Sequence, residues 1–327
     1  MTRLRAGMLV IALLLASAAA MSRAVGAQPP RVIKIGALTE SWGPTTGIVG
    51  LRDGLQALGY RENEHFVIGV RFTQGDPAEL PLAARELVRH GVDIIVTSEA
   101  SNAAVAAKAA TSTIPIVFIG GSDPVGLGLV KSFARPGGNV TGIADVDELV
   151  AKRLEIFREL VPGLKRVLLP YDATNEQSVA QLGPYREAGR RLGITLIERP
   201  LRDQEEAQAV IAGIRRQEVD GILSPRFLSL NIPGFIVEAG SRQRIPTMLH
   251  AGFFVDRGAL ASYSPSSHAM GRQAARLVDR ILKGAAPADL PVEQPTTFEF
   301  AVNLKVAAAL GLTIPQSLLL RADRVVQ

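Results

Sequence analysis

Hydroxyl, carboxylate and aromatic side chains collect in short polar segments, each directly after an apolar run of the sequence. Groups of these types hold a small polar or zwitterionic ligand with an apolar part, through hydrogen bonds and stacking. If the apolar runs are parallel strands, the segments meet beyond the carboxyl ends of the strands, where open parallel sheets bind ligands. The residues that we predict to contact such a ligand are Thr39, Ser41, Trp42, Ser98, Glu99, Ala100, Ser122, Asp123, Tyr171, Asp172, Ser224 and Arg226.

The charged and polar groups of this set have separate expected roles. Hydroxyls and backbone N–H groups at Ser98, Ser122 and a helix start at Asp123 would hold a ligand carboxylate, because helix N-termini favour anions. Asp172 or Glu99 would meet a cationic amine. These residues therefore predict a ligand that carries a negative carboxylate and a positive amine.

Several of these residues also have a purely structural explanation. Ser98 and Ser122 could only cap the helices that follow them. Trp42, the only tryptophan, stands in a loop flanked by Gly and Pro, which favours contact with an apolar part of the ligand over packing between domains. Tyr171 could do either. For Arg226, a solvated loop position is commoner than pairing with a ligand carboxylate.

Sequence motifs of catalysis are absent. The glycines after the first apolar run lack the dinucleotide-binding spacing, and there is no P-loop sequence. In segment 120–124 a proline stands where a nucleophile elbow needs glycine. The four histidines are dispersed and there is no cysteine, so we predict no metal site, no cofactor and no catalytic residues. We expect a binding protein, and a hydrolase-like enzyme using the same site is the alternative.

Apolar runs and helical periodicity alternate along the chain, which is typical of parallel sheets covered by helices on both faces. The predicted strands are 31–38, 66–72, 94–97, 116–118, 166–169, 195–198, 221–223, 247–249 and 298–303. The predicted helices are 48–58, 77–89, 103–110, 149–160, 176–192, 204–217, 269–282 and 304–310. This α/β alternation indicates Rossmann-like sheets.

The second half of the pattern repeats the first at an offset of about 130 residues. Segment 86–98 returns as 213–225, each with a Val-Asp pair before a short strand, and segment 113–118 returns as 244–249. An offset this long indicates two similar lobes, not a solenoid. Two open sheets that face each other would leave a ligand cleft between the lobes.

Loop signals set the expected lobe boundaries. Segment 135–142, Arg-Pro-Gly-Gly-Asn-Val-Thr-Gly, is predicted to carry the chain to the second lobe, and 259–262 to lead back to the first. We expect one lobe at 28–142 plus about 264–287, and the other at 143–263 plus about 288–327. The hinge would lie near 141–144 and 261–264.

The first 27 residues have the pattern of a secretory signal peptide. Arg3 and Arg5 precede an apolar run at 8–20, and Val25-Gly-Ala27 offers small residues for cleavage. The run is shorter than the roughly 20 residues that span a bilayer, and a membrane anchor is the alternative. The missing cysteine excludes a lipid anchor at the cleavage site. We expect cleavage near Ala27 and a periplasmic, monomeric mature protein.

The charge pattern argues against nucleic acid as a partner. Removing Arg3, Arg5 and Arg23 with the signal peptide lowers the formal net charge from +5 to +2 (5 − 3). The remaining basic residues are scattered among acidic ones, and nucleic-acid-binding proteins instead gather them in patches.

Several phrases of the sequence resemble one known family. They are 113–130, which ends in Gly-Gly-Ser-Asp-Pro-Val-Gly-Leu-Gly-Leu-Val, and 134–142, 151–155, 159–162, 303–305, 309–315 and 318–323. They are similar to ABC-transporter substrate-binding proteins of the tryptophan/tyrosine-binding-like group. The resemblance covers essentially the whole chain after the signal peptide. The resemblance implies the type I periplasmic-binding-protein fold, with two α/β lobes, three hinge crossovers and closure on a ligand. It also implies an ABC permease and an ATPase as partners.

From this resemblance and the residues above, we expect a periplasmic solute-binding receptor that delivers an amino acid or related carboxylate to an ABC importer. A ligand sensor that feeds a membrane signalling protein is an alternative with the same fold. Loops 39–43 and 169–173 depart from the family's pattern. Because both would touch the ligand, its identity is the least transferable inference.

Overall fold

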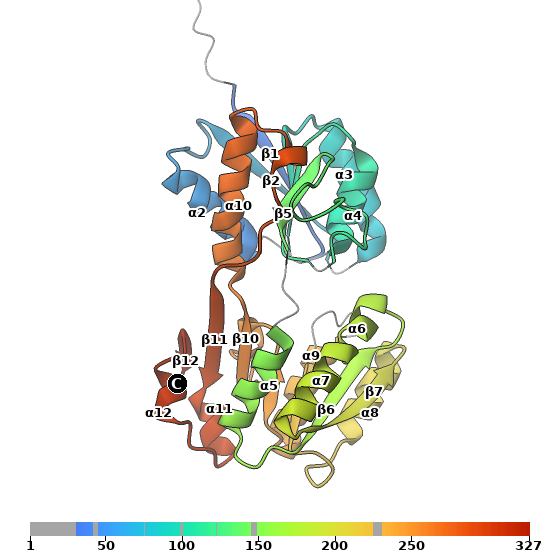
Figure 1. The fold of residues 1–327 in the computed structure, drawn as a ribbon, viewed down its shortest axis with the longest axis vertical. Helices are drawn as coiled ribbons and strands as arrows, with labels where there is room; N and C mark the ends of the chain where they lie inside the picture. Colours follow the sequence, from blue (N-terminus) through green and yellow to red (C-terminus); the bar gives the residue numbers. More distant parts are fainter. Residues whose placement is uncertain are drawn as a thin grey trace, which may run out of the picture.

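The protein is described by a computed structural model, which places residues 31–41, 45–74, 76–98, 101–121, 123–144, 149–224 and 231–327. The predicted signal peptide lies outside these residues. The chain forms two α/β units, each built on its own sheet, and Figure 1 shows them one above the other along the long axis of the molecule. Among the described residues, no helix has the length and apolar content needed to cross a bilayer.

The first sheet has five parallel strands in the order β2-β1-β3-β4-β5. These are β1 (Ile33–Thr39), β2 (Phe66–Phe72), β3 (Ile94–Ser98), β4 (Ile116–Ile119) and β5 (Val140–Ile143). One face is covered by η1 (Pro77–Glu79), α3 (Leu80–Arg89) and α4 (Ser101–Ala110), and the other by α2 (Thr46–Ala57) and α10 (Ser267–Leu282) (Figure 1). Helices on both faces explain why the inner strands β1, β3 and β4 are mostly buried and apolar, whereas the edge strand β2 is buried only at Phe66.

The second sheet has seven strands in the order β12-β11-β10-β9-β8-β6-β7. They are β6 (Arg166–Asp172), β7 (Thr195–Leu201), β8 (Gly221–Leu223), β9 (Thr247–Leu249), β10 (Ala261–Pro265), β11 (Phe298–Asn303) and β12 (Arg324–Val326). One face packs on α5 (Leu149–Leu160), α7 (Leu182–Leu192), α11 (Leu304–Ala309) and α12 (Gln316–Leu319), and the other on α8 (Gln204–Gly213) and α9 (Ile232–Gln243). The pairing of β10 with β11 is antiparallel, and the other pairs are parallel.

The internal repeat of the sequence is a repeat of topology. The order β2-β1-β3-β4-β5 recurs as β7-β6-β8-β9-β10, so the first and second halves place their strands alike. Segments 86–98 and 213–225 supply the equivalent strands β3 and β8, and segments 113–118 and 244–249 supply β4 and β9. The predicted α/β fold of two helix-covered sheets is confirmed.

The described elements connect the two sheets three times. The chain passes from β5 to α5, from β10 to α10, and from η3 (Pro287–Asp289), which packs beside β5, to β11. The first crossing was predicted at 135–142, which is wrong, because 140–143 forms the edge strand β5 and the crossing follows it. The segment 135–142 thus includes the first three residues of this strand. Gly142 in the strand has no room for a side chain, because a Cβ there would lie 2.3 Å from the Phe118 carbonyl oxygen.

Other differences from the predicted elements are local. Segment 259–262 does not leave the second lobe, because β10 at 261–265 pairs with β9 and β11 before the chain crosses. The predicted helix 176–192 is divided into α6 (Glu176–Ala180) and α7, and the predicted helix 204–217 ends at Gly213. Helix α9 and strand β12 were not predicted from the sequence.

Helix α10 lies far along the chain from the strands of the first sheet. It is held against this sheet by close packing on α2. Each helix begins at a hydroxyl cap: Thr45 accepts a hydrogen bond from the Ile48 N–H, and Ser266 from the Ala269 N–H. Glycines allow the two backbones to touch, since a Cβ on Gly50 would lie 2.0 Å from the His268 carbonyl oxygen. Helix α10, which follows the second crossing, is thereby fixed to the lobe that contains β1.

Candidate ligand site

The carboxyl ends of the strands in each sheet point toward the other lobe. Strand β5 is parallel to the rest of the first sheet, and its carboxyl end leads directly to the second lobe. Strand β10 is parallel to β9, and its carboxyl end leads directly to α10 on the first lobe. The loops after both sets of parallel strands therefore face each other across the crossover region, where such sheets bind ligands.

In the first lobe, three predicted residues lie together at the ends of β1 and β3. The buried Thr39 hydroxyl accepts a 3.2 Å hydrogen bond from the Ser41 N–H and lies 3.2 Å from the Ser41 hydroxyl. The Ser98 hydroxyl is 2.7 Å from that of Thr45, the cap of α2. Ser98 thus joins the N-terminus of α2 to the end of β3, a partner that sequence analysis did not anticipate because it is 53 positions away.

Asp123 has a different local structure from the one predicted. No helix begins there, and the described residues after it, 124–128, form turns. The backbone of Asp123 is left-handed, with φ at 48°, and its carboxylate accepts a 2.8 Å hydrogen bond from the Gly126 N–H. The predicted helix start is therefore wrong, because Asp123 caps a tight turn through its own side chain.

In the second lobe, Asp172 and Tyr171 end β6 and point to opposite sides of the sheet. The Asp172 carboxylate is buried and accepts hydrogen bonds from the N–H (2.8 Å) and hydroxyl (2.6 Å) of Thr174. The Asp172 N–H donates to the Ser178 hydroxyl at 3.1 Å, which fixes the start of α6. The half-buried Tyr171 ring packs on the core beneath α5 and α7. Of the two loops that depart from the family's pattern, 169–173 is therefore held in place by the hydrogen bonds of Asp172.

Ser224 follows β8 and lies beside the residue that follows β9. Its buried hydroxyl is 3.2 Å from Nδ1 of His250. The His250 ring packs on Phe254 at 5.4 Å, and Phe253, 53% exposed, stands edge-on to Phe254 at 5.2 Å. The Arg257 guanidinium lies 3.8 Å from the centre of the Phe253 ring. This aromatic pair was not predicted from the sequence, although it lies only a few residues after β9.

Five of the predicted contact residues, Trp42, Glu99, Ala100, Ser122 and Arg226, lie outside the described residues. The other seven lie at the carboxyl ends of β1, β3 and β6 or in the segments that follow β1, β4 and β8. Within each lobe the structure thus brings the described members to the same edge of the sheet.

Glu40 lies at the same edge of the first sheet and was not among the predicted contact residues, although it stands between Thr39 and Ser41. Its Oε1 atom is buried and has no hydrogen-bond partner in the described part of the chain. Burial raises the pKa of this carboxyl above its usual value, and a hydrogen bond from the Asn102 side chain opposes the rise. No grouping of His, Cys, Asp and Glu among the described residues has the composition of a metal site.

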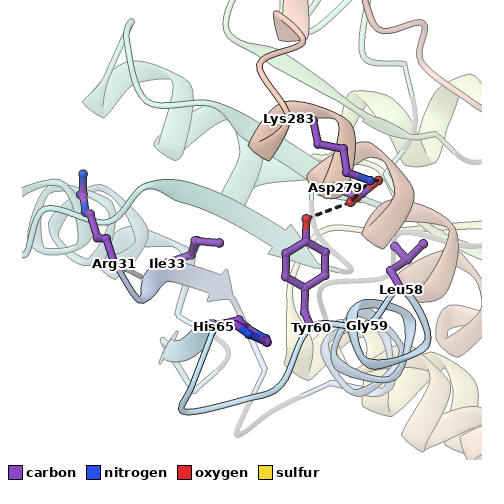
Figure 2. Close-up of a pocket in the computed structure, with 8 residues that line it drawn as sticks. All are labelled: Arg31, Ile33, Leu58, Gly59, Tyr60, His65, Asp279 and Lys283. Carbon is purple, nitrogen blue, oxygen red and sulfur yellow. Dashed lines mark hydrogen bonds and ion pairs between the residues drawn. The ribbon is translucent and has the colours of Figure 1, made fainter. Parts of the chain in front are cut away.

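A pocket of about 290 Å³ lies at the opposite end of the first sheet, where β1 begins (Figure 2). Its polar groups are largely paired with one another: the Tyr60 hydroxyl donates to Asp279 at 2.9 Å, and Lys283 pairs with the same carboxylate at 2.8 Å. Burial and the Asp279 carboxylate raise the pKa of Tyr60 to about 12. The pocket is lined by Arg31, Ile33, Leu58, Gly59, Tyr60, His65, Asp279 and Lys283, and it is remote from the strand ends that face the other lobe.

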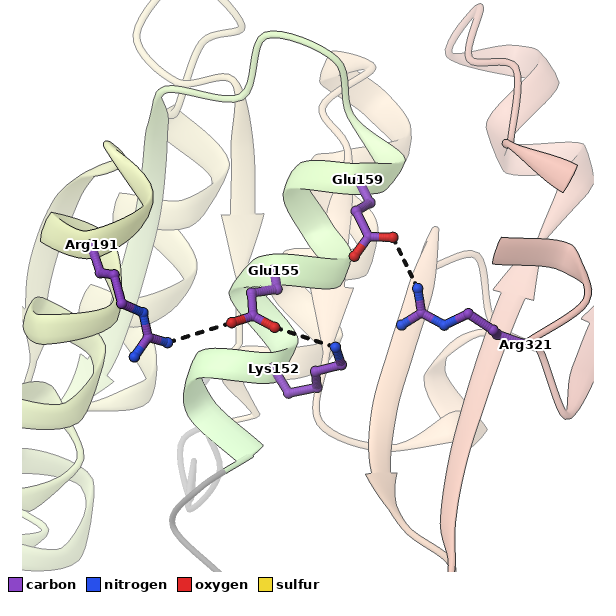
Figure 3. Close-up of polar contacts among 5 residues, drawn as sticks. All are labelled: Lys152, Glu155, Glu159, Arg191 and Arg321. Atoms are coloured by element: carbon purple, nitrogen blue, oxygen red, sulfur yellow. Dashed lines mark hydrogen bonds and ion pairs between the residues drawn. The ribbon is translucent and has the colours of Figure 1, made fainter. Parts of the chain in front are cut away.

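Ion pairs on α5 hold the second lobe together away from the site (Figure 3). Glu155 pairs with Lys152 on its own helix at 3.3 Å and with Arg191 of α7 at 3.4 Å. Glu159 pairs with Arg321 at 3.0 Å, which ties the C-terminal segment to α5. All these side chains are about one-third or more exposed, so each pair stabilises the fold by about 1 kcal/mol or less.

Similar proteins share both the sequence and the two-lobed architecture. A family model described as ABC transporter substrate binding protein matches residues 33–326. A tyrosine-binding protein of Clostridioides difficile (strain R20291) is 26% identical over 264 residues, which are 80% of this chain and 76% of that protein. The ABC domain from Streptococcus pneumonia in complex with L-Trp is 28% identical, with a TM-score of 0.81. A conserved domain protein from Vibrio cholerae O1 biovar El Tor is 30% identical, also at 0.81, and each of these two structures matches 90% of this chain over 100% of its own.

Proposed function

Because the chain belongs to the ABC transporter substrate-binding protein family, we propose that it is a periplasmic receptor for an aromatic amino acid. The ligand binds between the two lobes and is passed to a permease and ATPase in the inner membrane. The receptor acts as a monomer, reaches the periplasm through a signal peptide cleaved near Ala27, and does not alter its ligand chemically. Import is proposed in preference to sensing because the family model that matches this chain is described as ABC transporter substrate binding protein.

The proposed ligand class rests mainly on the similarity to a solved domain with bound L-Trp, which is 28% identical and covers 90% of this chain. A curated relative named for tyrosine supports the same class. Both molecules are zwitterions with an aromatic ring. The loops at the strand ends here supply the matching groups: hydroxyls, carboxylates and exposed aromatic surface.

The hydroxyls of Thr39, Ser41 and Ser98 lie where a ligand carboxylate would meet the N-terminus of α2. Positive partial charge at a helix N-terminus favours an anion. On the second lobe, Phe253 is the exposed ring of an aromatic pair at the carboxyl end of β9, and with Trp42 and Tyr171 it would cover the ligand ring. Contacts from both lobes would favour a closed arrangement, since only that arrangement makes all of them together.

The three crossings explain how such a receptor would move. Each lobe has its own apolar core, and the connections run through the short stretches after β5, after β10 and before β11. Rotation in these stretches would leave both sheets intact. We propose lobe boundaries close to those given above, with the hinge just beyond the expected 141–144 and 261–264, because these ranges lie largely within β5 and β10.

A thermal-shift panel tests the ligand class. The mature protein is heated with each of the common amino acids, with simple sugars and with nucleosides. A ligand present at about 1,000 times its Kd adds about 4 kcal/mol to the stability of the folded state, which should raise Tm by roughly 8–16 °C in a protein of this size. Stabilisation by L-Trp or L-Tyr is expected, and stabilisation by sugars or nucleosides alone would contradict the proposal.

A further inference from the structure

Glu40 carries a buried carboxylate oxygen that lacks a partner among the described residues. The neighbouring Asn102 donates a hydrogen bond to this carboxylate, but no described Lys, Arg or His forms an ion pair with it. Leaving a charged acceptor buried and unpaired is costly, so proteins normally match such a group with a cation or a donor. The first lobe therefore holds a buried carboxylate oxygen for which the described residues supply no partner.

Two buried hydroxyls on the strands next to β1 also lack a hydrogen-bond partner among the described residues. Of the five buried side-chain atoms without a partner in the described residues, three are Glu40 Oε1, Thr73 Oγ1 and Thr97 Oγ1. The sheet register pairs Thr39 with Phe72 and Leu38 with Thr97, so Glu40 and Thr73 are the next residues along β1 and β2. These three polar atoms thus belong to adjacent strands at the carboxyl edge that faces the second lobe.

Alternation along β1 and β3 places Glu40 and Thr97 on one face of the sheet, and Thr73, next to Glu40 when the register is continued, shares that face. Leu38 and Ile95 belong to the core cluster beneath α3 and α4, and two positions further on are Glu40 and Thr97. The hydrogen bond from Asn102, in the first turn of α4, is consistent with this face for Glu40. Glu40 is only half-buried as a residue, so it stands at the boundary between the core of the lobe and the strand ends.

We propose that Glu40 accepts the cationic amino group of the ligand, with the hydroxyls of Thr73 and Thr97 as neighbouring acceptors. The inference rests on the proposed function and names the group that would distinguish an amino acid from its deaminated acid. One carboxylate and two hydroxyls match the three N–H donors of an ammonium group. Asp172, the described residue that was predicted for this role, already holds its own loop through hydrogen bonds with Thr174 and Ser178.

The test compares two ligands that differ only in the amine. Calorimetric titrations of the mature protein use L-Trp against indole-3-propionate, and L-Tyr against 3-(4-hydroxyphenyl)propionate. Glu40→Gln, which keeps the shape and removes the charge, should weaken the amino acid roughly 10- to 150-fold, the value of one charge-assisted hydrogen bond. Affinity for the deaminated acid should not fall. Glu198→Gln is the matched control, because Glu198 pairs with Arg186 on the second lobe, and it should change neither affinity.

Several outcomes separate this inference from its premise. If wild-type protein binds the amino acid and Glu40→Gln binds it equally well, the inference is wrong, and a buried water satisfies Glu40. Equal losses for both ligands would show a purely structural role and also overturn it. If wild-type protein binds no aromatic amino acid, the proposed function fails. The inference would still be supported if the protein binds another amine and Glu40→Gln lowers the affinity for that amine. It would be overturned if the ligand of the protein carries no cationic group. Thr97→Val, a near-isosteric change, gives a second variant if Glu40→Gln folds poorly, and it should weaken only the amine-bearing ligand.

Discussion

Asp93 and Asp220 hold the same place in the two lobes, each just before the third strand of its repeat. The Asp93 carboxylate accepts a 2.8 Å hydrogen bond from the Lys34 N–H, and the Asp93 N–H donates to the Lys34 carbonyl at 2.8 Å. Asp220 makes the same two bonds with Arg166, also at 2.8 Å. An arginine side chain pairs with each carboxylate, Arg31 in the first lobe and Arg166 in the second. The repeated Val-Asp pair therefore joins the first and third strands of each repeat.

Replacing Asp220 should destabilise the second lobe. Its carboxylate accepts hydrogen bonds from two backbone N–H groups, those of Lys165 and Arg166, and from the Arg166 side chain. Asp220→Ala leaves these donors without their acceptor and should lower the free energy of unfolding by about 1–2 kcal/mol. Urea denaturation measures the change, with the exposed Asp289→Ala as a control that should cost less than about 0.5 kcal/mol. Equal effects for the two variants would contradict the role given to Asp220.

The same residue should make stability depend on pH. Burial acts to raise the pKa of Asp220, but the hydrogen bonds from Arg166 and the backbone outweigh it and hold the pKa below its usual value. A carboxyl group with a lowered folded-state pKa stabilises the fold above its unfolded pKa of about 3.9, and this contribution disappears as the pH falls through the folded-state value. The difference between wild type and Asp220→Ala should thus be full at neutral pH and shrink below about pH 4. If the difference in unfolding free energy between the two proteins instead grows as the pH falls, the pKa of Asp220 is not lowered in the folded state.

Adding a methyl group between α2 and α10 should loosen the first lobe. The Cβ of Gly50→Ala would stand 2.0 Å from the backbone oxygen of His268, and that of Gly271→Ala 2.0 Å from the backbone oxygen of Gly47. Either change must push the helices apart, at a cost of about 1–3 kcal/mol or more. Tm measured by circular dichroism should fall by roughly 2–4 °C for each kcal/mol. Gly213→Ala, at the end of α8 with open space around its Cβ, should be neutral or slightly stabilising.

Glu40 should lower the stability of the ligand-free protein. Because burial raises its folded-state pKa, the ionised group destabilises the fold at neutral pH, and this penalty disappears as the pH falls below the unfolded value. Glu40→Gln should therefore have a higher Tm than wild type at pH 7, and the two curves should converge in acid. Glu40→Asp retains the charge and should show no such gain. A lower Tm for Glu40→Gln at every pH would instead indicate that the carboxylate has a stabilising partner.

Ligand binding should bring the lobes together. If the ligand contacts both sets of strand ends, it favours the arrangement in which both contacts exist. Small-angle X-ray scattering should therefore give a smaller radius of gyration with saturating ligand than without it. A saturating ligand that leaves the radius of gyration unchanged would mean that the ligand occupies one lobe only.

The amino-acid sequence predicts the layered fold well because periodicity is local. The apolar run at 66–72 and the helix at 149–160 coincide with β2 and α5. Strand β5 was mistaken for a loop, because its four residues follow a Gly-Gly turn and are recognisable as a strand only beside β4. Helix α9 was missed because Pro233, Gly234 and Gly240 weaken its helical pattern.

The candidate site was predictable only in outline. Polar residues after apolar runs identify the strand ends, and Thr39, Ser98, Asp172 and Ser224 all lie there. Their hydrogen-bond partners are not visible in a sequence, since Ser98 meets Thr45 and Ser224 meets His250 only in the folded chain. Glu40 was passed over for the same reason, because what sets it apart is a buried oxygen without a partner.

Isothermal titration calorimetry of the mature protein with L-Trp and L-Tyr tests the central claim most directly. We expect saturable binding of at least one of them, with one molecule per chain. The deaminated analogue should bind more weakly by roughly 10-fold or more, as loss of a charge-assisted hydrogen bond requires. Saturable binding of a sugar or nucleoside, with no heat from any aromatic amino acid, would contradict the account.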